Sequence, residues 1–204
     1  MVLDSFRSPA DKILVPLSKP FMGMNPNSIS VLSLVFAGLT GILFYLGGLW
    51  IVVSFIALIL SAMFDAIDGK VARMKNIASK RGDLLDHVFD RYADIFIMLG
   101  FIFSRYAQLD VGLLAVIGVL LTSYLGVQSQ ALGLKRNYSG ILGRADRLVF
   151  MLVFILLQFF ISYRALFYGI LITPINILLI WFAVAGNITA VMRFRDTYTA
   201  LGSS

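Results

Sequence analysis

The chain has 204 residues, of which 59% are hydrophobic and only 14% are charged. Soluble domains are roughly 45–50% apolar and about 25% charged. This composition therefore excludes a soluble globular protein and a disordered chain, and it predicts an integral membrane protein. The net charge of +6 is explained by cytoplasmic Lys and Arg beside lipid headgroups, so we expect no nucleic acid as a partner.

The first 24 residues mix charged and apolar side chains, with Arg7, Lys12 and Lys19 among apolar neighbours such as Phe6 and Phe21. We expect residues 1–24 to form an amphipathic helix lying in the membrane interface, rather than a cleavable signal peptide or a disordered leader. The run Asn25-Pro26-Asn27-Ser28 then ends this segment and caps the next helix.

Six apolar runs follow that are long enough to cross a bilayer. We expect spans at residues 27–48, 51–72, 84–104, 111–133, 147–163 and 174–195. The fifth span requires a break before Pro174, because an unbroken helix over residues 148–192 would be more than about 60 Å long. The predicted fold is all-α, with six transmembrane helices forming one membrane domain over residues 25–201.

Lys and Arg are concentrated in the leader, in two of the connections and in the C-terminal tail. The positive-inside rule therefore places both termini and the loops 70–82 and 134–146 in the cytoplasm of a multi-pass protein of the cell membrane.

Six of the 11 acidic residues, all of them Asp, lie within residues 65–94. They are Asp65, Asp68, Asp83, Asp86, Asp90 and Asp94. The first two are three residues apart near the end of the second span, and the other four form one stripe on the third helix. Ionisable groups at membrane depth indicate a functional site, and carboxylates facing one another repel unless something neutralises them.

A divalent cation resolves this repulsion, because oxygen ligands suit Mg²⁺ or Mn²⁺, and a pair of ions typically serves phosphoryl chemistry. Between the two acidic groups, Gly69 and Gly82 allow close approach to the backbone, and Arg73 offers a planar fork for phosphate oxygens. A diphosphate site is the favoured interpretation. A proton or cation pathway through a transporter or channel is the alternative, although it would not need Arg73.

The run Asp65-x2-Asp68-Gly69-x2-Ala72-Arg73-x8-Gly82-x3-Asp86-x3-Asp90 resembles the complete signature of the CDP-alcohol phosphotransferase family. The segments Pro26–Ser30 and Gly186–Ala190 are also similar to that family's first and last spans. The resemblance implies an enzyme of phospholipid biosynthesis that moves a phosphatidyl-type group from a CDP-linked lipid to a polar alcohol and releases CMP. It also implies a homodimer.

The resemblance assigns roles to individual residues. It implies that two Mg²⁺ ions, or Mn²⁺ as a substitute, are held by Asp65, Asp68, Asp86 and Asp90, and that Asp90 is also the general base. The implied nucleotide-binding residues are Asn27, Asp68, Gly69, Ala72, Arg73, Ser79 and Gly82. We expect His87 to be a polar neighbour of the cations rather than a ligand, because oxygen ligands already suffice.

The acceptor alcohol is the open point. Residues 90–94, 123–124 and 143–147 resemble the subgroup that uses inositol phosphate, which makes that acceptor the preferred prediction. Its candidate ligands are Arg91, Lys135, Arg144, Arg147 and Arg193. Residues 125–130 lack the basic side chains usual in that subgroup, so serine, glycerol, glycerol phosphate and free inositol remain alternatives. Arg144 and Arg147 also have a purely topological interpretation as positive-inside charges.

Overall fold

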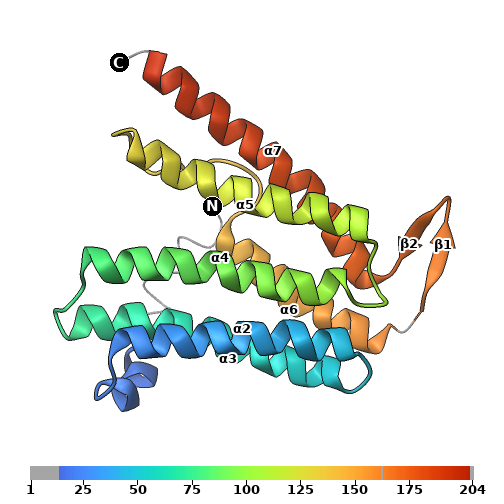
Figure 1. Cartoon of the computed structure of the whole chain (residues 1–204), viewed down its shortest axis with the longest axis horizontal. Coiled ribbons are helices and arrows are strands. Elements are labelled where there is room, and N and C mark those ends of the chain that lie inside the picture. Colours follow the sequence, from blue (N-terminus) through green and yellow to red (C-terminus); the bar gives the residue numbers. More distant parts are fainter. Residues whose placement is uncertain (1–13, 162, 203–204) are drawn as a thin grey trace. The chain divides into compact units, whose positions relative to one another are not determined.

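The computed structural model describes residues 14–161 and 163–202, which are mostly helical (Figure 1). The described elements fall into two compact units, one ending at Gly100 and the other beginning at Phe101. The elements are η2 (Lys19–Phe21), α2 (Pro26–Leu46), α3 (Trp50–Met74), α4 (Lys80–Ile102), α5 (Leu109–Ala131), α6 (Arg144–Phe160), β1 (Ala165–Phe167), β2 (Ile170–Ile172) and α7 (Pro174–Gly202).

Each of the six expected spans overlaps one of the helices α2 to α7. The predicted cap of the first span is confirmed, because the Asn25 side chain accepts a hydrogen bond from the Asn27 N–H at 3.0 Å and Pro26 is the first helical residue. Residues 14–18 are helical. Residues 1–13 lie outside the described part of the chain, so the amphipathic helix over residues 1–24 stays a prediction.

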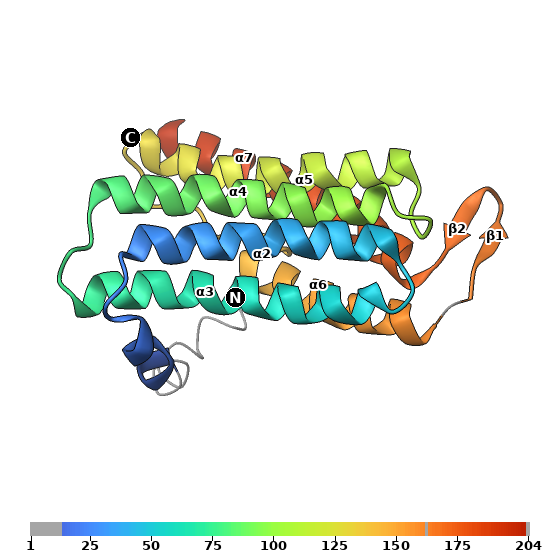
Figure 2. The ribbon, with the colours of Figure 1, turned by 60° about the horizontal axis from the view of Figure 1, so that its bottom comes forward.

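In the N-terminal unit, α2 runs alongside α3, as Figures 1 and 2 both show. Two buried serines cross-link these helices, since each hydroxyl of Ser33 and Ser61 donates to the other's carbonyl at 2.9 Å. Helix α4 approaches α2 just as closely, because a Cβ atom on Gly100 would collide with the backbone of Gly41. Small residues and buried hydroxyls are the usual means of close helix packing in membranes.

In the C-terminal unit, α5 packs along α7 in the same way. Gly118 and Gly186 face each other there, since a Cβ on Gly186 would lie 2.9 Å from the Gly118 carbonyl carbon. Thr122 Oγ1 donates to the Gly186 carbonyl at 2.8 Å. Helix α6 begins where the Asp146 carboxylate accepts from the Gly143 N–H at 3.0 Å.

The all-α prediction is wrong for residues 165–172, which form an antiparallel hairpin of β1 and β2. Its two turn residues, Tyr168 and Gly169, have φ of 48° and 81°, as a tight hairpin turn requires. The Gln108 side chain holds the hairpin, accepting from the Leu171 N–H at 2.9 Å and donating to the Gly169 carbonyl at 2.8 Å. The polar break in the sequence predicted a connection here but not its pairing.

Within residues 14–161 and 163–202, four helices are long and apolar enough to cross a membrane, namely α2, α3, α5 and α7. Helix α4 carries much of the charged motif, and α6 has 17 residues, which at about 1.5 Å per residue is short for a span. These four helices support the prediction of a membrane protein.

Candidate active site

The aspartate motif lies on the last turns of α3 and the first turns of α4, within the N-terminal unit. Helix α3 ends where Asn76 adopts a left-handed φ of 55° and its N–H bonds to the Arg73 carbonyl at 3.1 Å. Helix α4 begins where Ser79 Oγ accepts from the Gly82 N–H at 3.2 Å. Lys70 and Arg73 are therefore helical, and the predicted loop 70–82 is shorter than expected.

Asp68 is the buried carboxylate of α3, with 5% of its surface exposed. The hydroxyl of Ser30, which is also buried, donates to this carboxylate from α2. Asp65, one turn earlier, is half-buried. Ser30 lies in the Pro26–Ser30 segment that resembles the family's first span, but the sequence alone indicated no role for it. The only sequence feature that could have indicated its role is a hydroxyl on the face of α2 that packs against α3.

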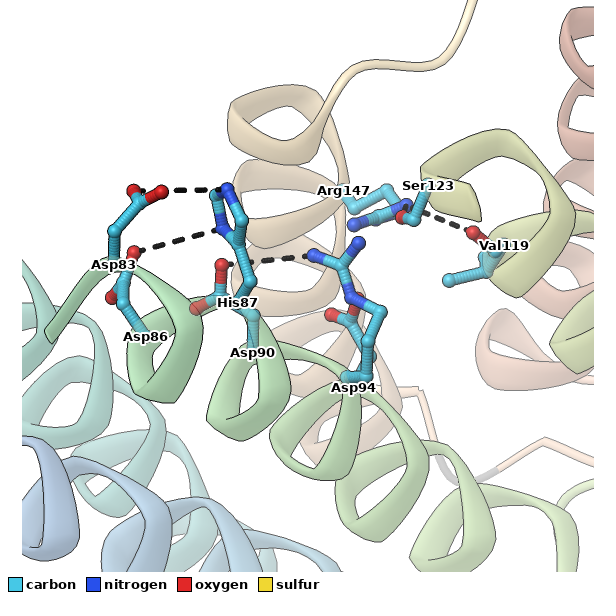
Figure 3. A network of polar contacts seen from close by, with 9 residues as sticks. Asp83, Asp86, His87, Asp90, Asp94, Val119, Ser123 and Arg147 are labelled. Carbon is cyan, nitrogen blue, oxygen red and sulfur yellow. Dashed lines mark hydrogen bonds and ion pairs between the residues drawn. The ribbon is translucent and has the colours of Figure 1, made fainter. Parts of the chain in front are cut away.

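On α4, the side chains of Asp86, His87 and Asp90 come together. Each offers one ligand atom, and these atoms all lie within 4.8 Å of one another. Asp90 is 5% exposed, whereas Asp86 is half-buried. Figure 3 shows the His87 ring beside the carboxylates of Asp83 and Asp86, each facing one ring nitrogen. Buried carboxylates clustered in this way fit a divalent cation, since a cation offsets the cost of burying negative charge.

Arg91 lies between two carboxylates of its own helix. Its Nη2 is 3.6 Å from Asp90 Oδ2, and its Nε is 3.9 Å from Asp94 Oδ2. The sequence predicted Arg91 as an acceptor ligand. In the structure its guanidinium compensates charge beside the candidate base.

The expected nucleotide-binding residues are distributed around the same helix ends. The Arg73 guanidinium lies beside Gly69, because a Cβ there would be 3.8 Å from Arg73 Nη2. Ala72 and Gly82 are half-buried. Arg73, Ser79 and Asn27 are exposed, Ser79 on the connection and Asn27 at the start of α2.

Two arginines of the C-terminal unit are buried, Arg147 with 2% and Arg193 with 6% of its surface exposed. Arg147 Nη1 donates to the Val119 carbonyl and to Ser123 Oγ, each at 3.4 Å (Figure 3). Arg193 Nη1 donates to the Thr122 carbonyl at 2.6 Å. The two guanidinium groups therefore bind the same turn of α5. Charges that served topology alone would be solvated, so burial argues against that interpretation for Arg147.

The other two basic candidates of this unit are exposed. Lys135 lies in the connection after α5, and Arg144 is the first residue of α6. The structure thus buries Arg147 and Arg193 against α5 and leaves Lys135 and Arg144 at the surface.

The family model for CDP-alcohol phosphatidyltransferases matches residues 24–192. The chain belongs to the CDP-alcohol phosphatidyltransferase family. The chain is similar to an archaetidylinositol phosphate synthase of Pyrococcus horikoshii, with 29% identity over 65% of this chain and 69% of the relative. It is also similar to an archaetidylinositol phosphate synthase of Methanothermobacter thermautotrophicus, with 34% identity over 45% of this chain and 47% of the relative.

A solved structure shares the fold. It is the phosphatidylinositol phosphate synthase PgsA1 of Mycobacterium tuberculosis with CDP-DAG bound, with a TM-score of 0.77 at 21% identity over 92% of this chain and 94% of that chain. A second structure of that enzyme, in complex with manganese and citrate, gives a TM-score of 0.77 at 22% identity over 91% of this chain and 89% of that chain.

Family membership confirms the class predicted from the sequence, a transferase of substituted phosphate groups in phospholipid biosynthesis. It gives no support to the transporter or channel alternative. The family match covers α2 to α6 and most of α7, so it includes the aspartates of α3 and α4 and the arginines of α6, and it ends one residue before Arg193.

Proposed function

We propose that this CDP-alcohol phosphatidyltransferase transfers a phosphatidyl or archaetidyl group from a CDP-linked lipid to inositol phosphate and releases CMP. The observation that supports inositol phosphate as the acceptor is that two guanidinium groups, of Arg147 and Arg193, are buried and bind one turn of α5. Guanidinium groups suit phosphate recognition. The names of the relatives from Pyrococcus and Methanothermobacter, archaetidylinositol phosphate synthases, support the same acceptor.

The carboxylates of Asp65, Asp68, Asp86 and Asp90 are the proposed holders of two Mg²⁺ ions, with Mn²⁺ as a substitute. Two of these four, Asp68 and Asp90, are almost fully buried, and such a donor set of oxygens fits a hard divalent cation. When bound, the ions neutralise the charge of the diphosphate and of the departing CMP.

Asp90 is the proposed general base. A carboxylate oxygen of Asp90 takes the proton of the acceptor hydroxyl while the hydroxyl oxygen forms a bond to the lipid-bearing phosphorus. The bond from that phosphorus to the bridging oxygen breaks, and CMP leaves with the bonding electrons. The exposed Arg73, Ser79 and Asn27, together with Gly69, Ala72 and Gly82, are the proposed contacts of the nucleotide and diphosphate.

The proposed acceptor ligands are those that the sequence predicts, Arg91, Lys135, Arg144, Arg147 and Arg193. Exposed Lys135 and Arg144 are available to attract an anionic acceptor from water, and the buried pair is suited to holding its phosphate. Serine and free inositol, which lack a phosphate, would leave these charges without a function. Glycerol phosphate would use them equally well.

We also propose six membrane spans, α2 to α7, with residues 1–24 in the membrane interface and both termini in the cytoplasm. This topology places the aspartate motif at the cytoplasmic face, where a lipid donor and a water-soluble acceptor meet. A homodimer is proposed from the resemblance to the family.

The experiment is a measurement of CMP release by the purified enzyme with a CDP-linked lipid, Mg²⁺ and a panel of alcohols. Inositol phosphate is expected to give the highest kcat/KM. The variant Arg193→Gln should raise the KM for inositol phosphate without changing the KM for the lipid. Arg164→Gln, an exposed arginine near the hairpin, is the matched control. A panel in which serine, free inositol or glycerol phosphate is preferred would overturn the proposed acceptor.

A further inference from the structure

His87 is the only histidine of the chain, and it lies beside two of the proposed cation ligands. Its Nδ1 is 4.0 Å from Asp86 Oδ2, and its Nε2 is 3.8 Å from Asp83 Oδ1 (Figure 3). The ring is half-buried, whereas Asp83 is exposed. The two ring nitrogens therefore face different carboxylates. Nδ1 faces Asp86, which is a proposed cation ligand, and Nε2 faces Asp83, which is not.

This arrangement resembles the environment of a metal-bound histidine. Such a histidine uses one ring nitrogen as the ligand and donates the N–H of the other to a carboxylate, which fixes the tautomer and the ring orientation. A rotation of the exposed Asp83 side chain, one helical turn before His87, would bring its Oδ1 from 3.8 Å into hydrogen-bond distance of Nε2–H. Nδ1 would then carry the lone pair on the side of Asp86.

The distances allow a shared ion. Two atoms bound to one Mg²⁺ lie at most about twice the metal–ligand distance apart, roughly 4.0–4.2 Å, and the ligand atoms of Asp86, His87 and Asp90 lie within 4.8 Å of one another. A side-chain shift of a few tenths of an ångström brings all three onto one cation.

We propose that His87 is a nitrogen ligand of the cation held by Asp86 and Asp90, with Asp83 as its positioning carboxylate, and that this ligand makes the site prefer Mn²⁺ to Mg²⁺. The inference rests on the proposed function of Asp86 and Asp90 as cation ligands. It replaces the expectation that His87 is only a polar neighbour. Carboxylate oxygens suit both ions. Mg²⁺ is the harder and smaller ion and keeps oxygen ligands, whereas Mn²⁺, a first-row transition metal, accepts an imidazole nitrogen more readily than Mg²⁺ does.

The decisive experiment uses the single histidine. Full-length protein labelled with ¹⁵N-histidine carries the label in one ring only, so pulsed EPR with less than one Mn²⁺ per chain reports on His87 alone. A directly bound ring gives a nitrogen coupling that changes between ¹⁴N and ¹⁵N protein. Bound Mn²⁺ without that coupling would overturn the inference and leave the aspartate site standing. Failure of the protein to bind either Mn²⁺ or Mg²⁺ would instead overturn the proposed cation site, and the inference with it.

Cation titrations of variants provide a second measurement. His87→Phe should weaken Mn²⁺ binding roughly tenfold or more and change Mg²⁺ binding much less. Asp83→Asn should weaken Mn²⁺ binding in the same direction, because the ring loses its orienting partner. Val88→Ala, an exposed neighbour on α4, is the control and should leave both affinities unchanged. Equal weakening of both metals by His87→Phe would contradict the proposed selectivity.

Discussion

Replacement of Ser30 by alanine removes the hydroxyl that donates to the Asp68 carboxylate, where both side chains are buried between α2 and α3. A hydrogen bond to a charged group contributes about 1.5–3 kcal/mol. Separately, loss of a residue that hydrogen-bonds to a metal ligand typically lowers metal affinity by about tenfold to hundredfold. We therefore expect Ser30→Ala to raise the Mg²⁺ concentration for half-maximal activity by that factor, because Asp68 loses the group that orients it.

The assay is CMP release at saturating CDP-linked lipid and acceptor over a range of Mg²⁺ concentrations. Ser33→Ala is a matched control, since Ser33 is equally buried on the same helix but its hydroxyl donates to the Ser61 carbonyl at 2.9 Å. The control should lower the melting temperature without moving the Mg²⁺ dependence. If Ser30→Ala and Ser33→Ala showed the same Mg²⁺ dependence, the role of Ser30 in holding Asp68 would be refuted.

Three further predictions concern the cation, the base and the packing. EDTA should abolish CMP release and added Mg²⁺ or Mn²⁺ should restore it; full activity in EDTA would exclude the cation site. Asp90→Asn should lower kcat by about 10²–10⁴ while the purified protein keeps its melting temperature within a few degrees; near-normal kcat would exclude Asp90 as the base. Gly100→Ala should lower the free energy of unfolding by about 1–3 kcal/mol, because the new methyl group would overlap the backbone of Gly41. Gly38→Ala should be nearly neutral by thermal unfolding, since its Cβ would meet only the Phe96 ring, at 3.8 Å.

The helices were predictable because their signals are local. Long apolar runs determine α2 to α7, and the Asn25-Pro26 pair determines where α2 begins. The aspartate motif was predictable for the same reason, since spacings of three and four residues place carboxylates on one helical face whatever the helix packs against.

The features that sequence reasoning missed depend on contacts between distant residues. Ser30 reaches Asp68, which is 38 residues away, only because α2 and α3 pack in one particular register. The hairpin of β1 and β2 is held by Gln108, which precedes it by about 60 residues. Burial of Arg147 and Arg193 likewise depends on how α5, α6 and α7 meet. Periodicity carries none of this information.

The division at Gly100 has an evolutionary consequence. All fixed positions of the aspartate signature precede that residue, whereas the buried arginines and most basic acceptor candidates follow it. With the proposed residue roles, mutations in the second half would change the choice of alcohol while the half that carries the aspartate signature is inherited intact. Chimeric chains joined near this residue would combine the donor chemistry of one homologue with the acceptor choice of another.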